Sequence, residues 1–214
     1  STTKVQVGTK GSQFIPVQLP DVRIASLGQR ALVTGANAVS PAPIAGGGDL
    51  TINGQIVPAS AADGVSNMLS TSSAIAKARA INEISSLTGV RAQAAPAVYV
   101  VPGAAISALV LNGTTNSLTI NGVNIGAVAA AAGDSEGSLR QAINTFSNQT
   151  GVTASLDPSG ALMLTAKDGR NFDISTTGSV ADELGLAIAD GDLSGYIQMG
   201  RVELSSGGTI TVGG

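Results

Sequence analysis

The amino-acid sequence predicts an α+β, strand-rich fold, in which two ββα-type units lie between an entering and a returning β-hairpin segment. Short stretches that alternate apolar and polar residues are typical of strands with one buried face. The pentapeptide Leu-Thr-Ile-Asn-Gly occurs twice, each time ahead of a segment whose apolar residues have helical spacing. The 28 Gly residues, together with many Ser, Thr and Asn, indicate frequent turns, so the elements must be short.

The second unit carries the most specific pattern. Residues 117–120 alternate as a strand, and Asn121-Gly122 supplies two residues that tolerate φ > 0, as a type I′ hairpin turn requires. Residues 123–125 resume the alternation. We expect a helix over residues 135–149 that ends at Gly151. Its apolar face consists of Leu139, Ala142, Ile143 and Phe146.

The first unit is an earlier copy of the same pattern. Leu50–Gly54 match Leu118–Gly122 at an offset of 68 positions (118 − 50), and Thr88-Gly-Val90 match Thr150-Gly-Val152 at an offset of 62 (150 − 88). The first copy is therefore six residues longer between hairpin and helix. Its helix is predicted over residues 72–88, with Ile75, Ile81, Ile84 and Leu87 on or near one face.

Further strands are predicted on both sides of these units. Residues 4–19 form a β-hairpin whose second strand contains Pro16 and lies at an edge. Residues 37–48 are rich in Pro and Gly and indicate a linker. Two buried strands, residues 98–101 and 108–111, flank a Pro-Gly turn.

The chain after the second helix contains explicit turn signals. Asp157–Gly160 and Asp168-Gly169 are predicted hairpin turns that separate strands at residues 152–156, 161–165 and 171–174. A short helix follows, with Ser179 as its N-cap, Asp182 at N3 and Gly185 as its stop. The tail is predicted to alternate as strands over residues 196–199, 201–204 and 207–212.

These patterns divide the chain into four parts. Residues 1–46 form an entering β segment and linker, residues 47–107 the first unit, and residues 108–178 the second unit. Residues 179–214 form a returning β segment that packs near residues 1–30. We expect the two ends of the chain to lie together.

Composition excludes much enzyme chemistry. The chain has no Cys, which excludes disulfides and thiolate metal sites, and no His, the commonest general base. The net charge of −3 argues against nucleic acid as a partner. Aromatic residues make up 2% of the chain and Trp is absent, so the core must consist of small aliphatic side chains. We assign no catalytic, cofactor-binding or metal-binding residue, and expect no enzyme activity and no cofactor.

Several acidic residues are candidates for a calcium site or an acid/base pair. A calcium loop needs closely spaced oxygen ligands, and the spacing of these four aspartates does not provide them: Asp157, Asp168, Asp173 and Asp182. Asp134 and Glu136 are close enough in sequence to suggest an acid/base pair. However, they flank a helix N-terminus, where negative charge is already favoured. Gly46–Gly48 lack the Lys-Ser/Thr of a phosphate loop.

Modification and membrane insertion have plainer alternatives. Asn112-Gly-Thr114 and Asn148-Gln-Thr150 fit the N-glycosylation pattern, and also fit a hairpin turn and a helix end. Hydroxyl clusters at residues 70–73 and 175–177 suit O-linked sugar or local capping. Residues 94–111 carry no charge, but Pro96, Pro102 and Gly103 interrupt them, so we expect no membrane span. Residues 1–5 show no signal-peptide pattern, so we expect no signal peptide.

The second unit resembles a known motif. Leu118–Gly126, Ala142-Ile-Asn144, Thr150-Gly-Val152 and Leu162–Thr165 are similar to the IN motif of bacterial flagellins and hook-associated proteins. Gly200–Gly214 resemble the segment by which flagellins return from their outer domains. Val5–Gly8 with Ile24–Gly28 are similar to the segment that leaves the inner core.

This resemblance implies a structural role as the outer, surface-exposed and antigenic region of a flagellin. It implies an extracellular location in the flagellum and other flagellin subunits as partners, through terminal helices that this sequence lacks. Host antibodies or surface glycans are further partners that a filament surface meets. The sequence by itself should be monomeric. Two alternatives remain: a flagellar cap or hook-associated protein, and a secreted adhesin or glycan-binding β module.

Overall fold

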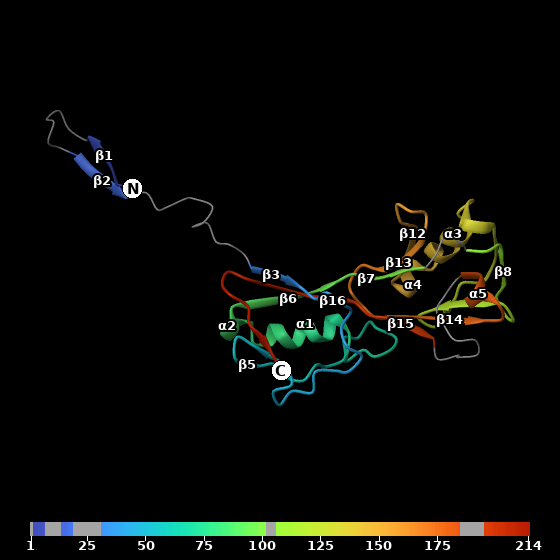
Figure 1. Ribbon diagram of the computed structural model, residues 1–214, viewed down its shortest axis with the longest axis horizontal. Helices are drawn as coiled ribbons and strands as arrows, with labels where there is room; N and C mark the ends of the chain where they lie inside the picture. The colour runs from blue at the N-terminus through green and yellow to red at the C-terminus, as the bar shows by residue number, and fades with distance from the viewer. Residues whose placement is uncertain (1, 7–13, 19–30, 102–105, 185–194) are drawn as a thin grey trace.

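A computed structural model describes residues 2–6, 14–18, 31–101, 106–184 and 195–214, and confirms the α+β, strand-rich fold class. Residues 31–214 form two bodies that lie one beyond the other along the long axis (Figure 1). We call residues 31–95 with 200–214 the first body. The second body comprises the described residues between 97 and 199.

The first body packs two small sheets around a helix. Its elements are β3 (Ala31–Thr34), β4 (Thr51–Ile52), β5 (Gln55–Ile56), α1 (Ala74–Glu83), α2 (Ser85–Thr88), β6 (Val90–Ala95), β16 (Arg201–Ser206) and β17 (Val212–Gly213). The sheets have the antiparallel orders β3-β16-β6 and β17-β4-β5. Between them lies a core of Ile44, Ile52, Val57, Ala80, Ile81, Val90 and Leu204.

The second body is larger and holds most of the buried apolar residues. Its elements are β7 (Ala97–Val100), β8 (Leu109–Asn112), β9 (Ser117–Ile120), β10 (Val123–Asn124), β11 (Ala127–Ala130), η1 (Ala132–Asp134), α3 (Ser138–Thr145), α4 (Ser147–Thr150), β12 (Thr153–Leu156), β13 (Leu162–Ala166), β14 (Phe172–Thr177), α5 (Val180–Leu184) and β15 (Tyr196–Gln198). Three sheets have the orders β10-β9-β14-β15, β11-β8 and β12-β13-β7. They enclose Leu139, Ile143 and Phe172, each fully buried.

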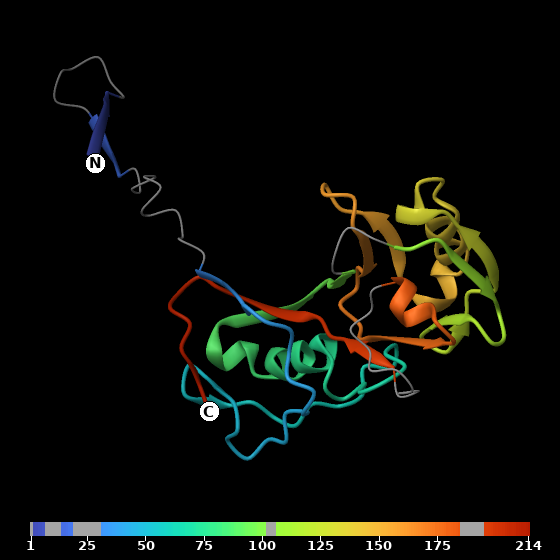
Figure 2. The same cartoon turned by 45° about the vertical axis from the view of Figure 1, so that its right-hand side comes forward.

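The chain passes between the two bodies twice, each time from one strand directly into the next. β6 continues into β7 past Pro96, and β15 continues into β16 past Gly200, as the turned view in Figure 2 shows. The backbone segments approach closely there. A Cβ on Gly200 would lie 2.8 Å from the Gly169 carbonyl oxygen and 3.0 Å from that of Ala95. Glycine at position 200 permits this approach, since any side chain would collide with backbone.

The predicted hairpins of both units are confirmed. Asn53-Gly54 and Asn121-Gly122 all have positive φ, between 49° and 79°, as a two-residue type I′ turn requires. The helix predicted in each of the two units is confirmed, with a break that the sequence did not predict. The breaks lie at Ile84, between α1 and α2, and at Phe146, between α3 and α4.

The expected apolar face of the first helix is partly wrong. Alanines make up most of the buried face of α1, which consists of Ala74, Ala76, Ala78, Ala80 and Ile81. Leu87 is 71% exposed, because the break at Ile84 turns the last residues away from the core. Small side chains on this face allow the sheet to pack closely against α1.

One predicted hairpin and the full burial expected of two strands are wrong. Asp168-Gly169 is not a hairpin turn: β13 pairs with β12 and β7, whereas β14 pairs with β9 and β15 in another sheet. The strands predicted on either side of a Pro-Gly turn both exist, as β7 and β8. However, β8 pairs with β11, and each of the two strands buries only alternate residues.

The entering and returning segments are described in part. β1 (Thr2–Gln6) and β2 (Phe14–Gln18) form the predicted antiparallel hairpin, with Pro16 opposite Lys4. Residues 7–13 and 19–30 and Ser1 lie outside the described residues, as does Gly185, so the expected meeting of the chain ends is untested. The returning strand β16 pairs with β3. Within the described ranges, no helix has the length and hydropathy of a membrane span.

Candidate functional site

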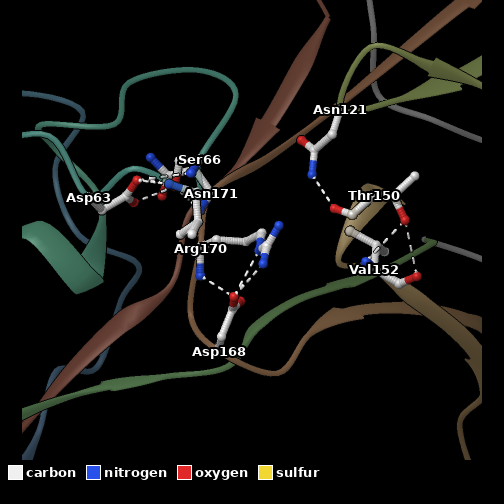
Figure 3. Close-up of polar contacts among 9 residues, drawn as sticks. Asp63, Ser66, Asn121, Thr150, Val152, Asp168, Arg170 and Asn171 are labelled. Atoms are coloured by element: carbon white, nitrogen blue, oxygen red, sulfur yellow. Dashed lines mark hydrogen bonds and ion pairs between the residues drawn. The ribbon is translucent and has the colours of Figure 1, made fainter. Parts of the chain in front are cut away.

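The polar feature that both units share is an asparagine that ties the hairpin turn to a helix end. In the second unit, Asn121 Nδ2 donates to the carbonyl oxygen of Thr150 at 2.6 Å, the last residue of α4 (Figure 3). Asn121 Oδ1 accepts from the backbone N–H of Asp173 on β14 at 3.1 Å, and the Asn121 backbone N–H donates to the Asp173 carbonyl at 3.0 Å. One side chain therefore joins three elements.

The first unit repeats these contacts. Asn53 Nδ2 donates to the Thr88 carbonyl oxygen at 2.9 Å, and Asn53 Oδ1 accepts from the Thr211 N–H at 2.8 Å. The Asn53 N–H donates to the Thr211 carbonyl at 2.8 Å. We call Asn53 and Asn121, with these partners, the asparagine clasps. The helix-end carbonyls of Thr88 and Thr150, to which the two asparagine amides donate, would otherwise lack a helical partner.

The helix ends that the clasps hold are built identically. Thr150 Oγ1 donates to the Phe146 carbonyl and accepts from the Val152 N–H, each at 3.1 Å. Thr88 makes the same pair of bonds with Ile84 and Val90 at 3.1 Å. The glycine that follows each threonine has a left-handed conformation and ends the helix.

A second asparagine in each unit joins the helix to the next strand. Asn144 on α3 donates to the Ala154 carbonyl at 3.0 Å and accepts from the Ala154 N–H at 2.8 Å. Asn82 on α1 makes both bonds to Ala92, each at 2.8 Å. Each amide side chain thus acts as one more backbone partner for an edge of β12 or β6. These repeated contacts identify the two units as duplicated structures.

The two bodies are joined by a polar bridge (Figure 3). The Asn171 N–H donates to Ser66 Oγ at 2.9 Å, and Asn171 Nδ2 donates to the Leu69 carbonyl at 3.1 Å. Asn67 Nδ2 donates to Asp173 Oδ1 at 2.9 Å. Ser66, Asn67 and Leu69 lie between the first hairpin and α1, the stretch that is six residues longer in the first copy. The extra length therefore forms the contact with the second body.

Asp63 holds this bridge in shape. Its carboxylate accepts from the N–H groups of Val65 and Ser66, at 2.9 and 2.8 Å, and from the Ser66 hydroxyl at 2.6 Å. Burial raises the pKa of Asp63, but these bonds and the nearby Ser73 hydroxyl outweigh burial, so the pKa falls below its usual 3.8. The bridge was missed in the sequence, because its partners lie about a hundred positions apart; the six-residue difference between the copies was the available signal.

Four of the candidate acidic residues have structural partners: Asp134, Asp157, Asp168 and Asp173. Asp134 is buried and accepts from the Leu139 and Arg140 N–H groups and from Arg140 Nε at 2.8 Å, so it caps α3. Asp157 caps its own turn, and the Ser159 hydroxyl is the main cause of its lowered pKa. Asp168 forms an ion pair with Arg170 at 2.7 Å. Among the described residues, no group of three His, Cys, Asp or Glu side chains is placed to hold a metal ion.

The possible modification sites differ in access. Asn112 is exposed at the end of β8, and Asn148 is exposed on α4. Ser72 and Ser73 are buried, and Ser73 caps α1 by accepting from the Ala76 N–H at 3.0 Å. Residues 175–177 lie in β14, half-buried. Helix capping therefore accounts for the buried part of the first hydroxyl cluster.

An apolar recess of about 300 Å³ opens on the first body. Its polar neighbours are Ser40 and Lys77, and Lys77 Nζ already donates to the Ser40 carbonyl at 2.8 Å. The remaining lining is aliphatic: Val33, Val39, Ile44, Leu50, Ile52, Ile81, Val202, Leu204 and Val212, with Gly35. The recess offers no converging polar groups of the kind that general acid–base catalysis needs.

Comparison with known proteins connects this architecture to a family. The family model described as "Flagellin hook IN motif" matches residues 117–168, which run from β9 to the turn after β13 and contain Asn121, Asn144 and Thr150. Flagellin A of Helicobacter mustelae is 33% identical over 175 residues, which cover 78% of this chain and 32% of that protein. The chain belongs to the flagellins.

Other flagellins agree with this assignment. Flagellin A of Helicobacter pylori is 30% identical over 211 residues, covering 94% of this flagellin chain and 38% of the relative. Flagellin B of the same species is 46% identical over 66 residues. The chain spans about a third of the length of the flagellin A relatives it matches. The IN match covers the second unit, and the first unit repeats its clasp contacts outside the matched residues.

Proposed function

We propose that this chain is an outward-facing part of the flagellin subunit of a bacterial flagellar filament, where it forms extracellular, antigenic surface. The similarity to flagellins A and B is the observation that carries the proposal. The polar network among the described residues of this chain also favours a structural role. Each asparagine and threonine of the clasps is engaged with backbone, which leaves none of them to bind a substrate.

The strand order favours a body that is inserted in a longer subunit. β3 enters the first body and β16 returns through the same sheet as its antiparallel neighbour. The chain continues from the first body into the second and back by β6–β7 and β15–β16. We infer that other flagellin subunits are contacted through parts of the subunit outside this chain, and that the isolated chain is monomeric. Host antibodies or glycans would meet its exposed faces.

We also propose a division of the chain that follows strand pairing. β7 was expected in the first unit, residues 47–107, but it pairs with β13 of the second unit. Strand pairing favours a boundary at Pro96 and a second one near Gly200. The first body would then be discontinuous in sequence, and completed only when residues 200–214 return.

Labelling of native flagella tests the proposal. Gold-labelled antibodies raised against this chain are applied to flagella and observed by electron microscopy. A filament subunit predicts label along the whole filament. Label confined to the tip would identify a cap protein, and label confined to the hook junction a hook-associated protein; either result refutes the proposal. Label on the cell body alone would favour the adhesin alternative.

A further inference from the structure

The chain contains three Asn-Gly pairs, at residues 53–54, 112–113 and 121–122, and the structure treats them differently. Asn-Gly is the sequence most prone to spontaneous loss of the side-chain amide, because glycine leaves the next backbone nitrogen unhindered. Whether a given pair reacts depends on how readily the fold releases that asparagine. We propose that Asn112 is a site of spontaneous deamidation, and that the clasps protect Asn53 and Asn121 from the same reaction.

The reaction needs only water. The Gly113 backbone nitrogen attacks Cγ of Asn112, so a new N–C bond forms; the Cγ–Nδ2 bond breaks, and ammonia leaves with the proton that the backbone nitrogen loses. The product is a five-membered succinimide. Water then opens either of its two carbonyl–nitrogen bonds and gives aspartate or isoaspartate at position 112. One negative charge is gained.

The amide of Asn112 is held only by its own turn. Its Oδ1 accepts from the Thr114 and Asn116 N–H groups at 2.9 and 3.0 Å, and its Nδ2 donates to Thr115 Oγ1 at 2.8 Å. The Gly113 N–H donates to the Asn116 carbonyl at 3.2 Å. All these partners lie within four residues of Asn112, and Asn112 is exposed. The Gly113 carbonyl also accepts from Asn124 Nδ2 at 3.0 Å, and Asn112 lies opposite Ala127 at the end of the β8–β11 pair. Opening this turn together with the adjoining end of β8 therefore frees both reacting groups.

The clasp asparagines are held by distant elements. Asn121 is bound to Thr150 and Asp173, which are 29 and 52 positions away. Asn53 is bound to Thr88 and Thr211, 35 and 158 positions away. Releasing either amide requires a helix end and a strand to separate, a larger opening than fraying of a turn.

The product also fits the turn at Asn112 and not the clasps. A carboxylate at position 112 still accepts from Thr114 and Asn116, and the Thr115 hydroxyl can turn to donate to it. At position 121 a carboxylate oxygen would face the Thr150 carbonyl oxygen, where the structure places a donor. Deamidation is therefore tolerated where it is fast and disruptive where it is slow.

Peptide mass spectrometry of the full chain tests the proposal. The folded protein and a urea-unfolded sample are kept in mildly alkaline buffer, digested at intervals, and scored for deamidation at the three sites. In urea all three should convert at comparable rates. In the folded protein, Asn112 should convert faster than Asn53 and Asn121 by a factor on the order of tenfold or more. Equal rates in the folded protein, or conversion of Asn112 in urea alone, would overturn the proposal.

A destabilised variant tests whether the fold of the second body limits deamidation at Asn121 more than at Asn112. Leu139→Ala weakens the core of the second body without touching either asparagine. Conversion of Asn121 should then accelerate more than conversion of Asn112. An equal acceleration at both sites would show that the clasp does not set the rate. The Asn112→Asp variant supplies the reference peptide for the aspartate product, and isoaspartate is recognised by its separate elution.

Discussion

Replacing Asn121 with aspartate tests the clasp with the smallest change of shape. Asn121→Asp keeps the Oδ1 acceptor for the Asp173 N–H and removes the Nδ2 donor, so a negatively charged oxygen faces the Thr150 carbonyl. The lost hydrogen bond contributes about 0.5–1.5 kcal/mol, and the unsatisfied carbonyl costs about 1–3 kcal/mol. Thr150 is fully buried, so water cannot easily replace the donor. We expect a loss of about 2–4 kcal/mol in the free energy of unfolding.

Urea unfolding at neutral pH measures this loss. The midpoint should fall while the m-value, which reports the surface exposed on unfolding, stays unchanged. Asn53→Asp removes the equivalent donor, but Asn53 is exposed, so we expect a smaller loss of about 1–2 kcal/mol. Asn148→Asp is the surface control and should stay within about 0.5 kcal/mol of the parent. Equal stabilities for Asn121→Asp and Asn148→Asp would refute the role given to the clasp.

Three further predictions concern the turn, the core and the bridge. Gly122→Val forces a β-branched residue to φ 74° and should lower the free energy of unfolding in urea by about 1–3 kcal/mol. Gly207→Val is the control, because the added side chain meets open space there. Equal losses for the two variants would refute the turn assignment. Leu139→Ala should cost about 2–5 kcal/mol, whereas Leu87→Ala, at a side chain 71% exposed, should cost less than about 0.5 kcal/mol; similar losses would contradict the core assignment. Because the folded-state pKa of Asp63 is lowered, its ionised form stabilises the fold above the unfolded pKa near 3.8, and this stability is lost as pH falls through the lowered folded value. Asp63→Asn should therefore flatten the acid side of a stability–pH profile, and an unchanged slope would count against the bridge.

Local chemistry accounts for what the sequence predicted. Asn121-Gly122 and Asn53-Gly54 form the expected turns because few other residues adopt positive φ at low cost. The helix ends at Gly89 and Gly151 follow from the same property. These features depend on neighbours within a few residues, so a single sequence suffices to place them.

Partners far apart in the chain account for what the sequence did not predict. The turn role of Asn121 follows from its neighbours, but its bonds to Thr150 and Asp173 depend on how α4 and β14 pack. The move from β13 to β14 between sheets has the same local signal as a hairpin, since Asp-Gly fits both. The alanine face of α1 gives a weak hydrophobic pattern, and only the close approach of β6 and β16 explains it.

Hydrogen exchange of side-chain amides, measured by NMR, is the most direct test of the clasps. The account predicts that the Nδ2 protons of Asn53 and Asn121 exchange with water much more slowly than those of the exposed Asn148, with Asn121 the slowest of the three. Exchange of the Asn121 amide at the rate of Asn148 would contradict the claim that this side chain joins the hairpin to the helix end.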